Sequence, residues 1–251
     1  MVFKEKLTYY IIFSLFSVLL LTAVSASAQY NDSTFYHVSF APTGSINKAN
    51  GNTAYLLNNN LKFNIRKKVI SFNFTNTWIY GKQNAGLTNN DYSSFVDFNV
   101  YKGPEHFYYW GLVNYNTSYS LKINNQLLAG AGIAYSFIDK PNAYLNLSNG
   151  LLYDTSDLLI DGNRSVYHTY RNSFRLAIKF NINNLVTLES NTFLQNSLDR
   201  RNDYIIRSTS SLQLKLRSWL SVSSSLNYNR QNRTSSENLL FTYGLSFEKY
   251  F

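Results

Sequence analysis

Cysteine is absent from the 251 residues of this sequence. A disulfide, a thiolate metal site and the lipid-modified cysteine of a bacterial lipoprotein are therefore all excluded. Proline and methionine are also scarce, with 3 and 1 residues. Hydrogen bonds and burial alone must hold the fold together.

Charge is scarce as well. Charged residues make up 15% of the chain, against roughly 25% in soluble domains. After the N-terminal region there is no run of about 18 consecutive apolar residues, which excludes a helical membrane protein. Aromatic residues are instead abundant, at 17%. Together with many Asn and Ser residues, they favour strands with one lipid face and one wet face.

The first 28 residues have the three parts of an export signal. Lys4 and Lys6 give a positive start, residues 11–24 form an apolar run, and a small-residue cleavage site ends at Ala28. An uncleaved anchor helix is the alternative, but the polar residues that follow favour cleavage. We expect a signal peptide at 1–28 and a single mature domain at 29–251.

Apolar and polar residues alternate with period two through most of the mature chain. From Ile70 to Tyr80, for example, the even positions are mostly apolar or aromatic and the odd positions mostly polar. A soluble β-sandwich could show the same alternation. The number and length of the strands, with aromatic residues at their ends, instead predict an all-β fold, a single antiparallel transmembrane β-barrel.

About twelve strands are predicted, with ten or fourteen as alternatives. They lie at 35–46, 53–65, 69–80, 92–102, 106–121, 127–138, 143–154, 166–180, 185–196, 203–217, 220–230 and 239–251. Tight turns alternate with longer loops at 47–52, 81–91, 122–126, 154–165, 197–202 and 231–238. Outer-membrane barrels have short periplasmic turns and longer extracellular loops, so we expect both termini in the periplasm.

The chain ends on an aromatic residue, Phe251. Such a terminal strand is typical of the signal that the barrel-assembly machinery reads. Phe251 could also be an interfacial aromatic residue without that role, but its terminal position favours the assembly signal.

Four short motifs resemble one known family. They are residues 80–82 (YGK), 88–90 (TNN), 111–113 (GLV) and 130–135 (GAGIAY). They are similar to those of the salt-induced outer-membrane proteins, a β-barrel family defined by a domain of unknown function. The resemblance covers half or more of the mature chain. It implies an outer-membrane location and a barrel fold, and it implies no activity and no catalytic residue.

Gly130 and Gly132 suggest a place where the barrel bends or where bulky side chains from neighbouring strands fill its lumen. No helix follows them, which argues against a phosphate-binding loop. Catalysis would need a histidine beside a serine or carboxylate, but His37, His106 and His168 belong to no recognisable constellation. The sequence therefore predicts no catalytic, cofactor-binding or metal-binding residue.

The predicted loop at 154–165 contains three aspartates, Asp154, Asp157 and Asp161. Their spacing does not fit an EF-hand, so we interpret them as a solvated group. Residues 158–160 between them are apolar and could form a plug, contact a partner or pack over the barrel mouth.

The alternation also predicts which charged side chains line the lumen: Lys62, Asp97, Arg175, Lys179, Glu189, Arg207, Lys215, Arg217 and Glu248. Basic residues exceed acidic ones, as they do in the whole chain with its net charge of +9. A water-filled lumen of this kind would favour anions. Alternatively, the charges could pair across a closed lumen, because a barrel of about twelve strands is narrow.

These patterns favour an outer-membrane protein that passes small hydrophilic solutes, with a preference for anions. A non-conducting envelope barrel and a membrane-embedded lipid hydrolase are the alternatives. Expected partners are outer-membrane lipids, the barrel-assembly machinery and small anionic solutes. Nucleic acid is excluded as a partner by export.

Overall fold

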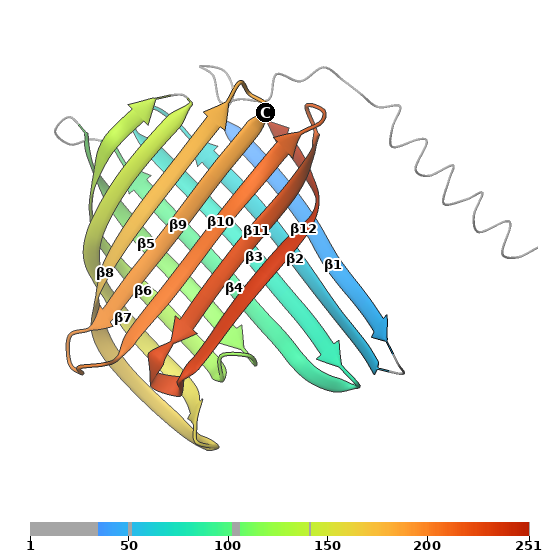
Figure 1. Cartoon of the computed structure of the whole chain (residues 1–251). Helices are drawn as coiled ribbons and strands as arrows, with labels where there is room; N and C mark the ends of the chain where they lie inside the picture. Colours follow the sequence, from blue (N-terminus) through green and yellow to red (C-terminus); the bar gives the residue numbers. More distant parts are fainter. Residues whose placement is uncertain (1–34, 50–51, 102–105, 141, 251) are drawn as a thin grey trace, which may run out of the picture.

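The computed structural model describes residues 35–49, 52–101, 106–140 and 142–250. Twelve strands form one closed antiparallel barrel, in which neighbours in sequence are neighbours in the sheet and β1 meets β12 (Figure 1). The predicted all-β, twelve-stranded barrel is thus confirmed. The expected signal peptide and Phe251 lie outside the described residues.

The strands are of 12 to 20 residues. They are β1 (Tyr36–Ala49), β2 (Asn52–Arg66), β3 (Ile70–Gln83), β4 (Gly86–Val100), β5 (Phe107–Ser118), β6 (Ile123–Lys140), β7 (Ala143–Ile160), β8 (Asn163–Ile182), β9 (Val186–Ser197), β10 (Tyr204–Lys215), β11 (Leu220–Gln231) and β12 (Ser236–Tyr250). A short 3-10 helix, η1 (Asn232–Thr234), precedes β12. Across the described part of the chain, no helix is long and apolar enough to span a membrane.

Two of the predicted longer loops are strand instead. Segment 81–91 contains a two-residue turn at Asn84 and Ala85, and segment 154–165 one at Asp161 and Gly162. All four residues have positive φ, between 48° and 80°, as a type I′ turn requires. That turn matches the twist of the flanking strands, so the strands continue through the segments that were expected to be loops. The loop predicted at 122–126 is likewise shifted, because β6 already begins at Ile123.

Both ends of the described chain lie at the same end of the barrel, which we call the near end; the opposite end is the far end (Figure 1). Directly paired residues point to the same side of the sheet. Arg171 of β8, for example, is opposite Leu152 of β7, and both are fully buried in the lumen. The intervening residues, such as Tyr170 and Leu151, are exposed on the outer surface.

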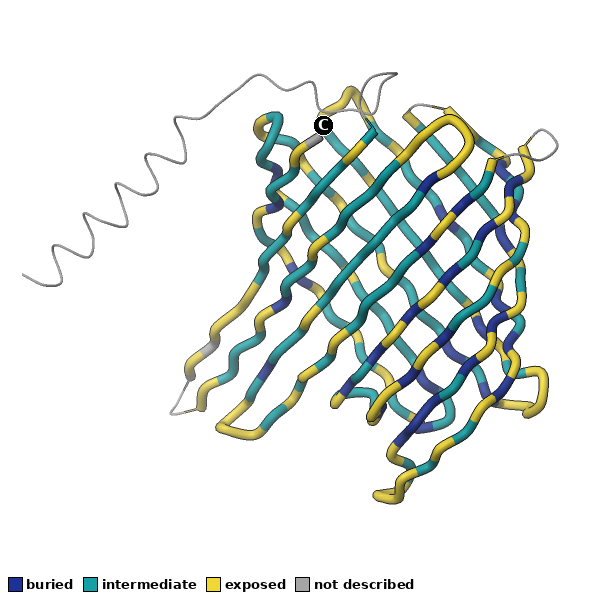
Figure 2. Tube along the Cα trace, turned by 180° about the vertical axis from the view of Figure 1, so that it is seen from behind, coloured by how far each residue is buried: buried dark blue, intermediate teal, exposed yellow. Residues whose placement is uncertain are grey.

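Burial is uneven around the barrel. Buried positions gather on the side that carries the long β7–β8 hairpin, where they alternate along the strands (Figure 2). The inward side chains of β10 to β12 are mostly only half-buried. One side of the lumen is therefore packed, and the other is in contact with solvent.

The β1–β12 ladder, called the seam below, is incomplete. Its paired residues run from His37 opposite Tyr250 to Thr43 opposite Gly244. Beyond that point the two strands diverge toward the far end (Figure 1). Pro42 lies where the ladder stops, and it has no N–H to donate.

Candidate functional site in the barrel interior

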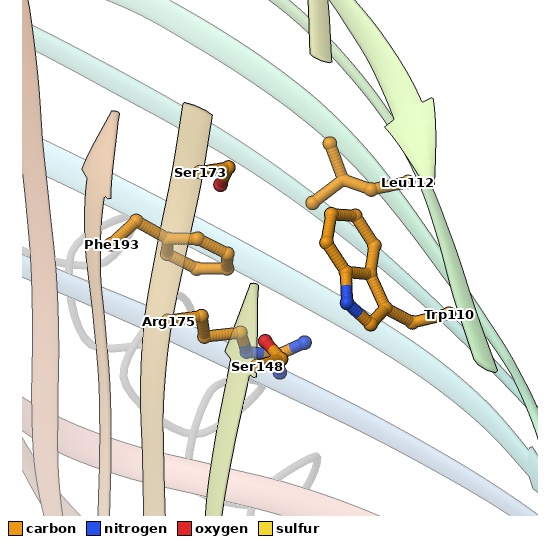
Figure 3. Close-up of a pocket in the computed structure, with 6 residues that line it drawn as sticks. All are labelled: Trp110, Leu112, Ser148, Ser173, Arg175 and Phe193. Atoms are coloured by element: carbon orange, nitrogen blue, oxygen red, sulfur yellow. The ribbon is translucent and has the colours of Figure 1, made fainter. Parts of the chain in front are cut away.

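Large side chains fill the lumen beside β4 to β9. The buried cluster contains Tyr108, Trp110, Leu112, Ala134 and Leu152, with Phe95 and Phe193 packed against it. Figure 3 shows Trp110 and Leu112 on one side of a small pocket and Arg175 and Phe193 on the other. The pocket has no room for a water molecule. This half of the lumen is therefore a packed core.

Two glycines, Gly132 and Gly150, provide the space for Trp110. A Cβ on Gly132 would come within 2.6 Å of the indole carbon Cζ2, and one on Gly150 would also meet that atom. The indole Nε1 donates to the carbonyl oxygen of Ile133 at 3.2 Å, which satisfies its buried donor. Gly130 is similarly crowded by Leu152. The structure thus supports the interpretation that glycines let bulky neighbours fill the lumen.

An ion pair crosses this packed region. Arg175 Nη1 lies 2.5 Å from Asp97 Oδ2, joining β8 to β4. Asp97 also accepts from Asn99 at 2.5 Å, and Arg175 Nη2 donates to Asn191 at 3.0 Å. The Arg175 guanidinium lies 5.1 Å from the centre of the Phe193 ring. Two of the predicted lumen charges therefore neutralise each other.

A second buried group of charges lies toward the far end, and the sequence analysis missed it. Arg171 is fully buried; its Nε lies 2.6 Å from Asp154 Oδ2 and its Nη2 lies 2.9 Å from Asp203 Oδ1. Tyr167 donates to Asp154 at 3.2 Å. The interpretation of Asp154 as a solvated loop residue was wrong, because β7 continues past it and it faces the lumen. Arg171 lies four residues before Arg175 on β8, so both side chains point to the same face of the sheet. This spacing could have predicted that Arg171 faces the lumen.

Arg207 makes another connection across the lumen. From β10 it donates to Gln126 of β6 at 2.7 Å and to Asn114 of β5. Gln126 in turn donates to Ser156 at 2.9 Å. Polar side chains from strands on different sides of the barrel are thus held together by hydrogen bonds.

The far mouth is covered by η1 and its neighbouring loop. Arg233 lies 3.1 Å from Asp203 Oδ2 and 3.4 Å from the centre of the Tyr167 ring. Thr234 Oγ1 donates to the carbonyl oxygen of Leu121 at 3.1 Å, in the β5–β6 turn on the other side of the mouth.

Asp199, in the β9–β10 loop, accepts from Thr169 at 2.5 Å, which lowers the pKa of its carboxyl group.

The other half of the lumen has a different lining. Most of its inward residues are small and polar: Ser39 and Thr43 on β1, Thr209 and Ser211 on β10, Ser223, Ser225 and Asn227 on β11, and Thr242 and Ser246 on β12. Ser225 and Thr242 share a hydrogen bond of 2.9 Å. Thr209 is exposed although it faces inward. We call this surface the hydroxyl wall.

Charged groups also line the near end. Lys179 is opposite Glu189 in the β8–β9 ladder, and Lys62 interacts electrostatically with the same carboxylate. Lys215 faces inward at the last position of β10. All predicted lumen charges lie on inward strand positions except Arg217, which lies in the turn between β10 and β11. Arg217 was misplaced because β10 ends two residues before it.

His37 comes closest to the constellation that a hydrolase would need. Its Nε2 lies 3.4 Å from Glu248 Oε2, and Ser221 donates to Glu248 Oε1 at 3.2 Å. A triad requires the histidine between the serine and the carboxylate, whereas here the carboxylate is in the middle. In the part of the chain that the structure describes, no three His, Asp or Glu residues are grouped to hold a metal ion.

The closed strand order, the apolar outer surface and the polar lumen define a β-barrel of the outer-membrane type. The NanC porin has the same fold, with a TM-score of 0.52 and 12% identity over 83% of this chain and 98% of that one. The translocator domain of the autotransporter NalP from Neisseria meningitidis gives 0.51 and 13%, over 96% and 97%. At these identities the similarity establishes the fold alone.

The chain belongs to DUF481, a family of proteins of unknown function, whose model matches residues 43–247. No curated protein matches the sequence. The family match agrees with the resemblance to a barrel family of unknown function.

Proposed function

We propose that this protein is an outer-membrane channel for small hydrophilic solutes, with a preference for anions. The observation that carries the proposal is the hydroxyl wall, where inward-facing Thr209 is exposed to solvent. A half-lumen lined by serine, threonine and asparagine offers hydrogen bonds to a passing solute without holding it tightly.

The preference for anions rests on the unequal charges of the lumen. Asp97 and Arg175 form a neutral pair. At the near end, three predicted lumen lysines lie near two predicted carboxylates, so positive charges outnumber negative ones: Lys62, Lys179 and Lys215 against Glu189 and Glu248. Excess positive charge in a narrow polar space concentrates anions there.

The proposal includes an orientation and two partners. The near end would face the periplasm after removal of residues 1–28, outer-membrane lipids would surround the apolar outer surface, and the assembly machinery would recognise the terminal strand. The long β7–β8 hairpin projects beyond the other turns at the far end (Figure 1), as longer segments do on the extracellular side of such barrels, and this supports the orientation.

A non-conducting barrel is the second candidate. It is favoured by η1, which covers the far mouth, and by the packed cluster around Trp110. Single-channel recording of the refolded chain 29–251 in a planar bilayer under a salt gradient separates the two candidates. Discrete steps with an anion-selective reversal potential support the channel, whereas a folded, heat-modifiable barrel that gives no steps supports the second candidate.

A further inference from the structure

The far half of the seam is an opening in the side of the barrel. In the described residues, β1 pairs with β12 as far as Thr43 and Gly244 and no further, although β11 pairs with β12 down to Ser236. Residues 44–49 of β1 and 236–243 of β12 therefore diverge (Figure 1). We call these two segments the open seam.

Exposure of the outward side chains marks the same segments independently. Ile46 of β1 is 82% exposed and Tyr243 of β12 is 70% exposed. On the adjacent paired strands, Leu57 of β2 and Leu226 of β11 are 44% and 43% exposed. Side chains along the open seam thus lack the neighbour that a complete ladder would give them.

The open seam joins an apolar surface to a polar one. Its outward rim is formed by Ile46, Leu239, Phe241 and Tyr243. Immediately inside are Ser45, which is exposed although its position faces the lumen, and the hydroxyl wall with Thr242. A molecule that occupied the open seam would therefore contact apolar side chains at one end and hydroxyl groups at the other.

Access through the far mouth is more restricted than access through the side. Arg233 and Thr234 hold η1 over the far mouth, and Trp110 and its neighbours fill the lumen beside β4 to β9. The open seam leads to the opposite half of the lumen, where Leu56 and Leu240 are the inward apolar residues beside otherwise small, polar side chains. For a molecule dissolved in the bilayer, it is the direct route to the hydroxyl wall.

We propose that the open seam admits a single-chain amphiphile, such as a fatty-acid anion, from the bilayer. The acyl chain would lie on the rim, and the head group would hydrogen-bond to the hydroxyl wall and to strand edges that lack a partner strand. Arg207 of β10 is partly exposed and lies two residues from Thr209 of the hydroxyl wall, so its positive charge suits an anionic head group. Unsatisfied backbone groups are costly in a membrane, so such an occupant also stabilises the two edges. The proposal does not depend on ion conductance.

A photoreactive fatty acid tests the proposal on the whole mature barrel in lipid nanodiscs. Stearic acid with a diazirine on its chain is irradiated with the unmodified protein, and the cross-linked residues are mapped by mass spectrometry. We expect cross-links concentrated on residues 44–49 and 236–243. An even distribution over the apolar outer surface would overturn the proposal.

A reversible closure gives the matched comparison. Continuing the register of the seam places Ile46 opposite Phe241. Because the chain has no cysteine, oxidation can join Ile46→Cys to Phe241→Cys once the two strands move together, the loss of both free thiols confirms the bond, and a thiol reductant reopens it. We expect severalfold less cross-linking to these segments when the pair is oxidised and recovery on reduction. A second pair, Val38→Cys and Lys249→Cys, lies in the paired part of the seam and should change nothing.

Three results would contradict the proposal. Cross-linking that is unchanged by oxidation places the fatty acid elsewhere. A disulfide-linked dimer of the oxidised variant would mean that a second copy of the chain occupies the open seam. Displacement of the fatty acid by an added extended peptide would mean that the natural occupant is a polypeptide strand. Conductance is recorded on the same samples, so a barrel that does not conduct but binds the fatty acid refutes the channel and leaves this inference standing.

Discussion

Trp110 occupies the space that a side chain at position 132 would need. A Cβ on Gly132 would lie 2.6 Å from Cζ2 of the indole, closer than two carbon atoms can approach. The same Cβ would also meet the carbonyl oxygen of Asn149 and Cα of Gly150 on the neighbouring strand, so Trp110 and the β7 backbone together require glycine at position 132.

Substitution Gly132→Ala tests this crowding. Because Trp110 is 6% exposed and has packed neighbours on both sides, we expect the free energy of unfolding to fall by about 1–3 kcal/mol. Urea unfolding of the refolded barrel in lipid vesicles measures the change. Gly111→Ala is the control, since its nearest atom would be 3.8 Å away. Equal losses in the two variants would refute the explanation.

Breaking the pair of Asp97 and Arg175 should be costly. Asp97 is 1% exposed, so Asp97→Leu leaves a guanidinium in the packed region without its carboxylate. We expect a loss of about 3 kcal/mol in unfolding free energy. The double variant Asp97→Leu with Arg175→Met should recover most of it, because neither charge then needs a partner. Additive losses in a double-mutant cycle would contradict the pairing.

Ion preference should depend on the near-end lysines. Replacing Lys62 and Lys215 by Gln removes two positive charges from the lumen, so the reversal potential should shift toward cations. Replacing Lys67 and Lys68 in the exposed β2–β3 turn removes the same net charge outside the lumen and should leave selectivity almost unchanged. Similar shifts in both variants would mean that the lumen does not determine selectivity.

Adjacent residues on β10 test which surface faces lipid. Leu212 points outward at mid-strand and is 48% exposed, whereas Ser211 points into the lumen. Leu212→Arg should lower the unfolding free energy in vesicles by about 2–4 kcal/mol if this position is near the bilayer midplane. Ser211→Arg should be better tolerated because the lumen is polar. The reverse order of stabilities would contradict the assigned faces.

The strand pattern could be predicted because each strand has two different surroundings. The alternation from Ile70 to Tyr80 is confirmed in β3, and the twelve strands follow from the same rule. Loop lengths were harder to predict, because Asn84 and Ala85 form a tight turn between strands that extend beyond the apolar band. Polar strand ends and loops have similar compositions, so sequence alone did not separate them.

The lumen contacts depend on the closed shape. Arg207 reaches Gln126 across the lumen, a relation between residues 81 positions apart that no local pattern encodes. The open seam is similar: Pro42 marks the place where β1 loses a donor, but the predicted strand at 35–46 gave it no special role. Periodicity specifies the face of each residue, whereas partners require the register and curvature of the whole sheet.

The seam also constrains how the barrel can form. Every other ladder joins strands that are consecutive in the chain and linked by a turn, so the two strands can pair soon after the second one is available. The seam brings His37 to Tyr250 and must close a loop of about 200 residues over a short run of pairs. Barrel closure is thus the slow, late event of assembly, and a chain truncated before β12 leaves β1 without the partner that ends the process.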